Sequence, residues 1–171
     1  MSRKQDYSKK ILKILGEKPA LPVETIKGND DTKTSYALTR SLKNLVGAGL
    51  VELHDSVNQS YAKITNKGKL KLNSIKLEAE DALVSNTWDG FWRIIILDIG
   101  EDRKNERESL RYLLKKANFV CVKNTVWISP LPYEHLFTNI KKDLGLTTEL
   151  MIIVTNKLDE ETAKVFFERM N

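Results

Sequence analysis

Six polar side chains could contact nucleic acid from one predicted helix, which begins at Thr32 or Thr34 and ends near Val46. The leucines of this helix repeat at a spacing that fits a single buried face. The residues left for its polar face are Lys33, Ser35, Tyr36, Thr39, Arg40 and Lys43. An arginine can donate two hydrogen bonds to a guanine edge, while lysines and hydroxyls can bind phosphates. The alternative interpretation is an ordinary solvated helix face.

The surrounding elements predict a winged helix-turn-helix domain over residues 1–69. The expected elements are three helices and a hairpin, at residues 8–16, 23–27, 32–46, 50–53 and 61–64. Pro19 and Pro22 break the chain between the first two helices. In this fold the third helix lies in the major groove, and the hairpin, or wing, contacts the backbone or the minor groove. The candidate DNA contacts on the wing are Asn58, Gln59 and Lys63.

The charge of the chain is unevenly distributed. The formal net charge is +5, but residues 1–80 carry +6 and residues 81–171 carry −1. A basic half joined to a nearly neutral half suggests that the first half binds a polyanion and that the second half has another task.

Residues 88–171 predict a ferredoxin-like βαββαβ domain, which makes the chain an α+β protein. The apolar run at residues 94–97 is typical of a strand buried on both faces. The expected elements after it lie at residues 103–116, 119–122, 126–128, 132–144, 149–155 and 160–170. A linker helix within residues 70–87 should join this domain to the winged helix, with a boundary turn at residues 85–89. Because bare strand edges need partners or cover, we expect the second domain to form a homodimer.

Other signals of chemistry are sparse. Cys121 is the only cysteine and lies in an apolar strand pattern, so we expect a buried, inert thiol. His54 and His135 are the only histidines, and no zinc-ligand spacing is present. We therefore expect no cofactor. With no apolar run near the ~20 residues that span a bilayer and a polar, basic start, the chain is expected to be cytoplasmic, with no membrane partner.

The helix at residues 103–116 carries basic residues that could form a second polyanion site. They are Arg103, Lys104, Arg107, Arg111, Lys115 and Lys116, and acidic residues alternate with them. We favour a solvated face held by ion pairs along the helix.

The stretch from Trp88 to Pro130 resembles the central domain of the PaaX-type phenylacetate-degradation repressors. The matching features include Trp88-Asp89-Gly90, Trp92-Arg93 and the segment from Val126 to Pro130. These repressors also begin with a winged helix, and the resemblance implies a dimeric DNA-binding repressor. Some members respond to acyl-CoA effectors. The longer members carry a further C-terminal domain, which this chain does not match, so no effector is assigned.

The same domain is similar to the small CRISPR-associated nuclease and spacer-integration protein. There Asp98 would match an aspartate that has been proposed to hold a divalent metal across a dimer, and Thr125-Val126-Trp127 would match a later motif. A hard cation prefers carboxylate oxygens and can activate water. The simpler interpretation is that Asp98 ends a strand and accepts hydrogen bonds from the following turn.

Three hypotheses remain open from the sequence. The favoured one is a homodimeric transcriptional regulator, a repressor, that binds double-stranded DNA. The others are a metal-dependent endonuclease that uses Asp98 and a scaffold subunit of a CRISPR-adaptation-like assembly. The charge distribution favours the first, because a nuclease should carry more basic charge on the domain that touches its substrate.

Overall fold

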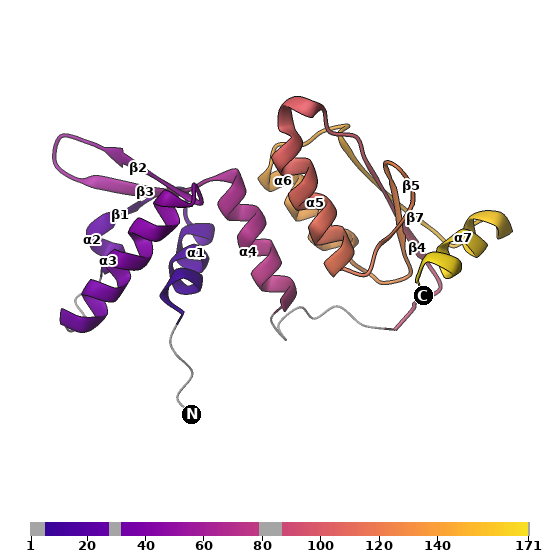
Figure 1. Cartoon of the computed structure of the whole chain (residues 1–171), viewed down its shortest axis with the longest axis horizontal. Helices are drawn as coiled ribbons and strands as arrows, with labels where there is room; N and C mark the ends of the chain where they lie inside the picture. Colours follow the sequence, from indigo (N-terminus) through magenta and orange to yellow (C-terminus); the bar gives the residue numbers. More distant parts are fainter. Residues whose placement is uncertain (1–5, 28–31, 79–86, 171) are drawn as a thin grey trace. The chain divides into compact units, whose positions relative to one another are not determined.

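The computed structural model describes residues 6–27, 32–78 and 87–170. The chain divides into two compact units, Met1–Ile75 and Lys76–Asn171, here called unit 1 and unit 2. Each unit combines helices with its own antiparallel sheet (Figure 1), so the α+β class is confirmed. In the described part of the chain, no helix is long and apolar enough to cross a membrane.

Unit 1 has the element order of a winged helix. Its elements are α1 (Tyr7–Glu17), β1 (Leu21–Pro22), α2 (Val23–Lys27), α3 (Thr32–Gly47), β2 (Val51–Asp55) and β3 (Ser60–Ile64), and the strand order is β1-β3-β2. Strand β1 was not predicted, because Pro22 was expected only to break the chain. Pro22 instead lies opposite Tyr61 in an edge strand of the sheet. At an edge, the N–H group that proline lacks is not needed for the hydrogen bonds between central strands.

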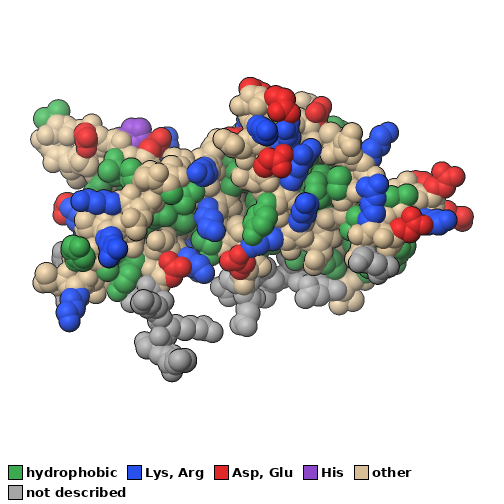
Figure 2. Space-filling model, viewed as in Figure 1, with side chains coloured by type: hydrophobic (Ala, Val, Ile, Leu, Met, Phe, Trp, Pro, Cys, Tyr) green, Lys and Arg blue, Asp and Glu red, His purple; other side chains and the backbone are tan. Residues whose placement is uncertain are grey.

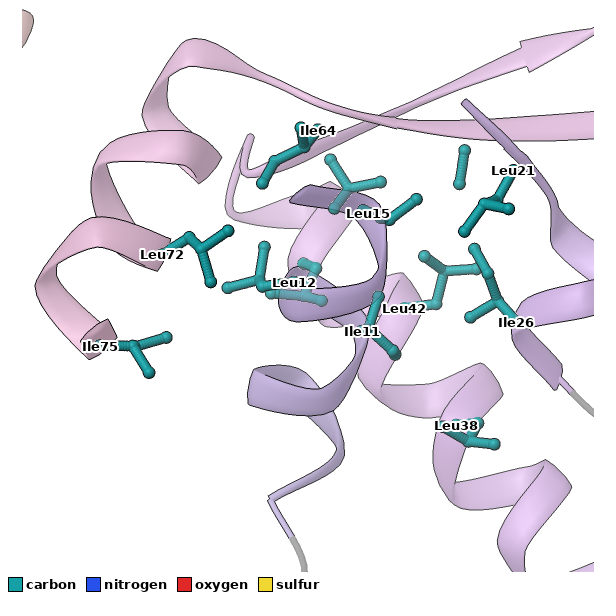
Figure 3. Packing of buried hydrophobic residues seen from close by; sticks show 13 residues of the cluster. Ile11, Leu12, Leu15, Leu21, Ile26, Leu38, Leu42, Ile64, Leu72 and Ile75 are labelled. Carbon is teal, nitrogen blue, oxygen red and sulfur yellow. The ribbon is translucent and has the colours of Figure 1, made fainter. Parts of the chain in front are cut away.

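The core of unit 1 is built from one face of each helix (Figure 3). Leu38, Leu42 and Leu45 are 2–4% exposed, as their spacing predicts, and they pack with Ile11 and Leu15 of α1. Fully burying a leucine stabilises a fold by about 1.5–3 kcal/mol. Three such residues on one face therefore fix which side of α3 points outward.

Helix α4 (Asn66–Glu78) completes this core. It begins at Asn66, four residues before the linker helix predicted from residue 70, and its Leu72 and Ile75 join the same cluster. The helix begins earlier in the sequence than predicted because the residues directly after β3 are bound to the end of α3. Residues 79–86 lie outside the described residues, so the domain boundaries stay a prediction.

The turn after α3 is attached to the beginning of α4 by three contacts. The Thr65 hydroxyl donates to the Gly49 carbonyl at 2.8 Å, and the Lys67 amine donates to the Ala48 carbonyl at 2.8 Å. Gly68 lies so close to the Leu50 carbonyl that a Cβ there would be 2.1 Å from the oxygen. These contacts hold the C-terminal end of α3 against the rest of unit 1.

We predict that Gly68→Ala destabilises unit 1 by about 1–3 kcal/mol, because backbone must move to admit the methyl group. Gly47→Ala is the matched control, since a Cβ there meets no atom within 4 Å. It should change stability by no more than about 1 kcal/mol, in the stabilising direction, because alanine favours helix over glycine. Urea unfolding of both variants measures the difference, and equal midpoints would contradict the close approach.

Unit 2 has the ferredoxin-like order of elements. They are β4 (Trp92–Leu97), a short 3₁₀ turn (Glu101–Arg103), α5 (Lys104–Lys116), β5 (Val120–Lys123), β6 (Val126–Ser129), α6 (Glu134–Asp143), β7 (Leu150–Thr155) and α7 (Glu160–Met170). The strand order β5-β6-β4-β7 makes this the split βαββαβ sheet that the sequence predicted. Figure 1 shows α5 and α6 on one side of the sheet and α7 on the other.

The two faces of the unit 2 sheet are not equally covered. On the α5–α6 side, Ile95 and Leu97 are at most 1% exposed. On the other side, Phe166 of α7 packs on Trp92 and Ile128, but Ile94 and Ile96 are only half-buried. The prediction that this strand is buried on both faces was therefore wrong for one face, because a single helix does not cover four strands.

Arg93 is a buried charge at the start of β4, with its side chain only 3% exposed. Its guanidinium donates to both carboxylate oxygens of Asp89, at 2.5 and 2.7 Å, and to both of Glu134, at 2.7 and 3.1 Å. These bonds hold the pKa of Asp89 at about 2, lower the pKa of Glu134 and raise the pKa of Arg93. The Asp-Gly-Phe-Trp-Arg segment thus ties β4 to the start of α6.

We predict that unit 2 loses stability as the pH falls from about 4 towards 2. The folded state holds the pKa of Asp89 below its ordinary value of 3.8, so the carboxylate stabilises the fold above that value and stops doing so as it protonates. Asp89→Asn should reduce the loss of the urea midpoint across this range. An unchanged pH dependence in the variant would contradict the role of this carboxylate.

Candidate nucleic-acid interface

Four of the predicted contact residues form one exposed stripe along α3. Lys33, Tyr36, Arg40 and Lys43 follow each other by three or four residues, so they share the face opposite the buried leucines. Figure 2, drawn in the same view as Figure 1, shows Lys and Arg side chains over the segment that contains α3. None of the three cations pairs with an acid within the described ranges. We refer to these four residues as the α3 stripe.

Tyr36 is the most unusual member of the α3 stripe. Its side chain is 70% exposed, so it makes no contribution to the core of unit 1. An exposed aromatic ring among cations can pack on sugars or bases while its hydroxyl bonds to a phosphate. The stripe therefore offers positive charge, a guanidinium fork and an apolar surface together.

Ser35 and Thr39 lie at the border of the stripe rather than in it. Both are half-buried, and the Thr39 hydroxyl donates to the Ser35 carbonyl at 2.9 Å. That hydrogen bond uses the only proton of the Thr39 hydroxyl inside the helix, which leaves its oxygen as an acceptor. Sequence reasoning missed Asn44, which is exposed and lies one turn after Arg40. The i+4 spacing from Arg40 was the available signal.

The predicted contacts on the wing have partners of their own. Asn58 and Gln59 are exposed in the loop between β2 and β3, and the Gln59 amide bonds to the Tyr61 hydroxyl. Lys63 lies opposite Glu52 across the hairpin, with its amine 3.8 Å from the carboxylate. His54 approaches the same carboxylate at 3.0 Å, and together with Lys63 it lowers the pKa of Glu52. Lys63 is thus partly neutralised, whereas the α3 cations have no acidic partner in the described part of the chain.

Asp98 follows β4 and is exposed. Its backbone N–H donates to the Glu149 carbonyl at 2.8 Å. The expectation that its carboxylate accepts hydrogen bonds from the following turn finds no donor among the described residues. The nearby Arg107 side chain in α5 donates to the backbone carbonyl of Ile99, the residue after Asp98. The described ranges also contain no group of three or more His, Cys, Asp or Glu side chains that could hold a metal ion.

The basic residues of α5 are largely paired with acids. Arg107 lies 2.7 Å from Glu101, and Arg111 lies 3.1 Å from Glu108. Arg103, in the 3₁₀ turn just before α5, bonds to Glu106, three residues further along the chain. The ion pairs expected along this segment are therefore present for these three arginines, although the Arg107 side chain is only 14% exposed and does not lie on a fully solvated face.

Cys121 does not have the environment that its strand pattern suggested. It lies in β5, which is an edge strand, and its side chain is half-buried. The prediction of a buried thiol was wrong because the pattern identifies a strand but not its place in the sheet.

Comparison with known families identifies unit 2. Residues 85–166 match the family described as the PaaX protein central Cas2-like domain. This match confirms the resemblance to the PaaX central domain that the sequence shows, over these residues. No curated protein matches the chain.

Proposed function

We propose that this protein is a transcription regulator that binds double-stranded DNA sequence-specifically, acts as a homodimer and represses its target genes. The observation that carries the proposal is the α3 stripe. Three cations without ion-pair partners among the described residues, together with an exposed tyrosine, lie on the outer face of the third helix of a winged helix. The third helix of this fold enters the major groove. The PaaX central domain in the same chain supports a regulatory role.

The wing and the flanking hydroxyls have secondary roles in this proposal. Asn58 and Gln59 would reach the DNA backbone or the minor groove, and Ser35 and Thr39 would accept or donate bonds at the edge of the groove. Lys63 should contribute less than the lysines of α3, because Glu52 already neutralises part of its charge. Arg40, Lys43 and Asn44 are the candidates for reading base edges.

The homodimer would form through the open part of the unit 2 sheet. Strand β7 is an edge strand, and Met151 and Ile153 are 44% and 39% exposed. They lie opposite Ile96 and Ile94 on the face that α7 covers only in part. An exposed apolar face beside a bare strand edge is a surface that a second copy can bury, and a two-fold dimer would present two α3 helices to a palindromic site.

We predict that Lys43→Ala and Arg40→Ala weaken binding to duplex DNA and also flatten its salt dependence. The slope of log K against log salt should fall by about one for each lost phosphate contact. Lys104→Ala is the matched control, because it removes the same charge from an exposed position in unit 2. Fluorescence anisotropy of the full chain between low and moderate salt measures both effects. Equal losses for the control and for the α3 variants would contradict an interface on α3.

A second prediction concerns the dimer. Ile153→Lys places a charge on the open sheet face and should convert the dimer into monomers in sedimentation equilibrium. Val57→Lys is the matched control, since Val57 is 99% exposed on the wing, in the other unit. It should leave the dimer intact. A wild-type protein that stays monomeric at concentrations that saturate DNA would overturn the proposed dimer without affecting the α3 interface.

A further inference from the structure

A pocket of about 630 Å³ lies beside edge strand β5 in unit 2. It is walled by the end of α5, the turn that follows, strands β5 and β6, the segment after β6 and the last turn of α7. The residues that matter for its chemistry are Lys115, Phe119, Trp127, Leu131, Arg169 and Met170. This volume falls within the range of roughly 300–1,000 Å³ that is usual for small-molecule sites.

The wall of the pocket combines an apolar surface with two cations. Phe119, Leu131 and Met170 supply the apolar part, and Lys115 and Arg169 supply the charge. No acidic residue is among the described residues that line the pocket. Arg169 donates from Nη1 to the Cys121 carbonyl at 2.6 Å, which positions the guanidinium. The group has four further N–H donors, and its planar fork matches the two oxygens of a carboxylate.

Trp127 also lines the pocket. Its ring forms part of the wall and is only 3% exposed, yet its indole N–H has no hydrogen-bond partner within the described ranges. Buried polar groups are nearly always hydrogen-bonded, because leaving one unpaired costs about 1–3 kcal/mol. By contrast, the indole N–H of Trp88 in the same unit donates to the Phe91 carbonyl at 3.0 Å. Because the indole nitrogen itself has almost no accessible surface, the Trp127 ring contributes an apolar part of the wall rather than a donor to a ligand.

We propose that this pocket binds a small organic carboxylate with an apolar body. The apolar body packs against Phe119, Leu131 and Met170. The carboxylate interacts with Arg169 and Lys115. Two cations in a mainly apolar pocket suit a single anionic group better than a polyphosphate. This site lies wholly in unit 2, so it goes beyond the proposed DNA binding and does not depend on it.

The test uses the full chain with naphthalene-2-carboxylate as the probe. The chain has three tryptophans, so a nitrogen-15 spectrum contains three indole signals, and the loss of one in Trp127→Phe assigns that residue. The Trp127 signal should shift on titration, with a dissociation constant below about 1 mM, which corresponds to about 4 kcal/mol. The neutral analogue naphthalene-2-methanol should bind at least about tenfold more weakly, because it has no charge to pair.

Variants separate the pocket from other apolar surfaces. Arg169→Gln should weaken the carboxylate about tenfold and leave the neutral analogue unaffected. Arg111→Gln, which changes an arginine of α5 outside the pocket wall, should have no effect. Equal affinity for the charged and the neutral probe would overturn the proposal, as would equal effects of the two variants. Shifts confined to Trp88 and Trp92 would place the probe on the opposite face of the sheet and would also overturn it.

Discussion

Burial of the leucine face of α3 is the interaction on which the functional argument depends. Each of the three leucines contributes about 1.5–3 kcal/mol when fully buried, whereas helix propensities of surface residues differ by only a few tenths. The core therefore sets the rotation of the helix, and Lys33, Tyr36, Arg40 and Lys43 face outward as a consequence. The contacts of Thr65, Lys67 and Gly68 then fix the C-terminal end of the helix, so the exposed stripe belongs to a rigid element.

The two units differ in how their charged side chains are paired. Among the described residues, the cations along α3 in unit 1 have no ion-pair partner, whereas most arginines of unit 2 pair with acids on the same or a neighbouring element. Its one buried arginine, Arg93, has two carboxylates, which is the arrangement that makes a buried charge tolerable. The net charges of +6 and −1 in the two halves reflect this difference. The apolar surface left open on unit 2 suits a protein partner, while the charge left open on unit 1 suits a polyanion.

Periodicity predicted most of the fold, because leucine spacing in α3 and short apolar runs in unit 2 are local signals. The errors concern neighbours in space. A two-residue strand containing Pro22 has no pattern of its own, and the half-buried state of Cys121 depends on β5 being at an edge. The pairing of Lys63 with Glu52 depends on the hairpin register, and the two bonds from Arg93 to Glu134 join residues 41 positions apart. The pocket at Trp127 could not be predicted, since four separate segments form it.

Selection of bound sequences from a random duplex pool, using the full chain, tests the central claim most directly. We expect a consensus with two inverted half-sites about one helical turn apart, because two α3 helices of a two-fold dimer would enter successive major grooves. We also expect that Arg40→Ala changes or loses the preferred bases within each half-site. Recovery of no consensus, or of the same consensus and affinity with Arg40→Ala, would contradict sequence-specific recognition through α3.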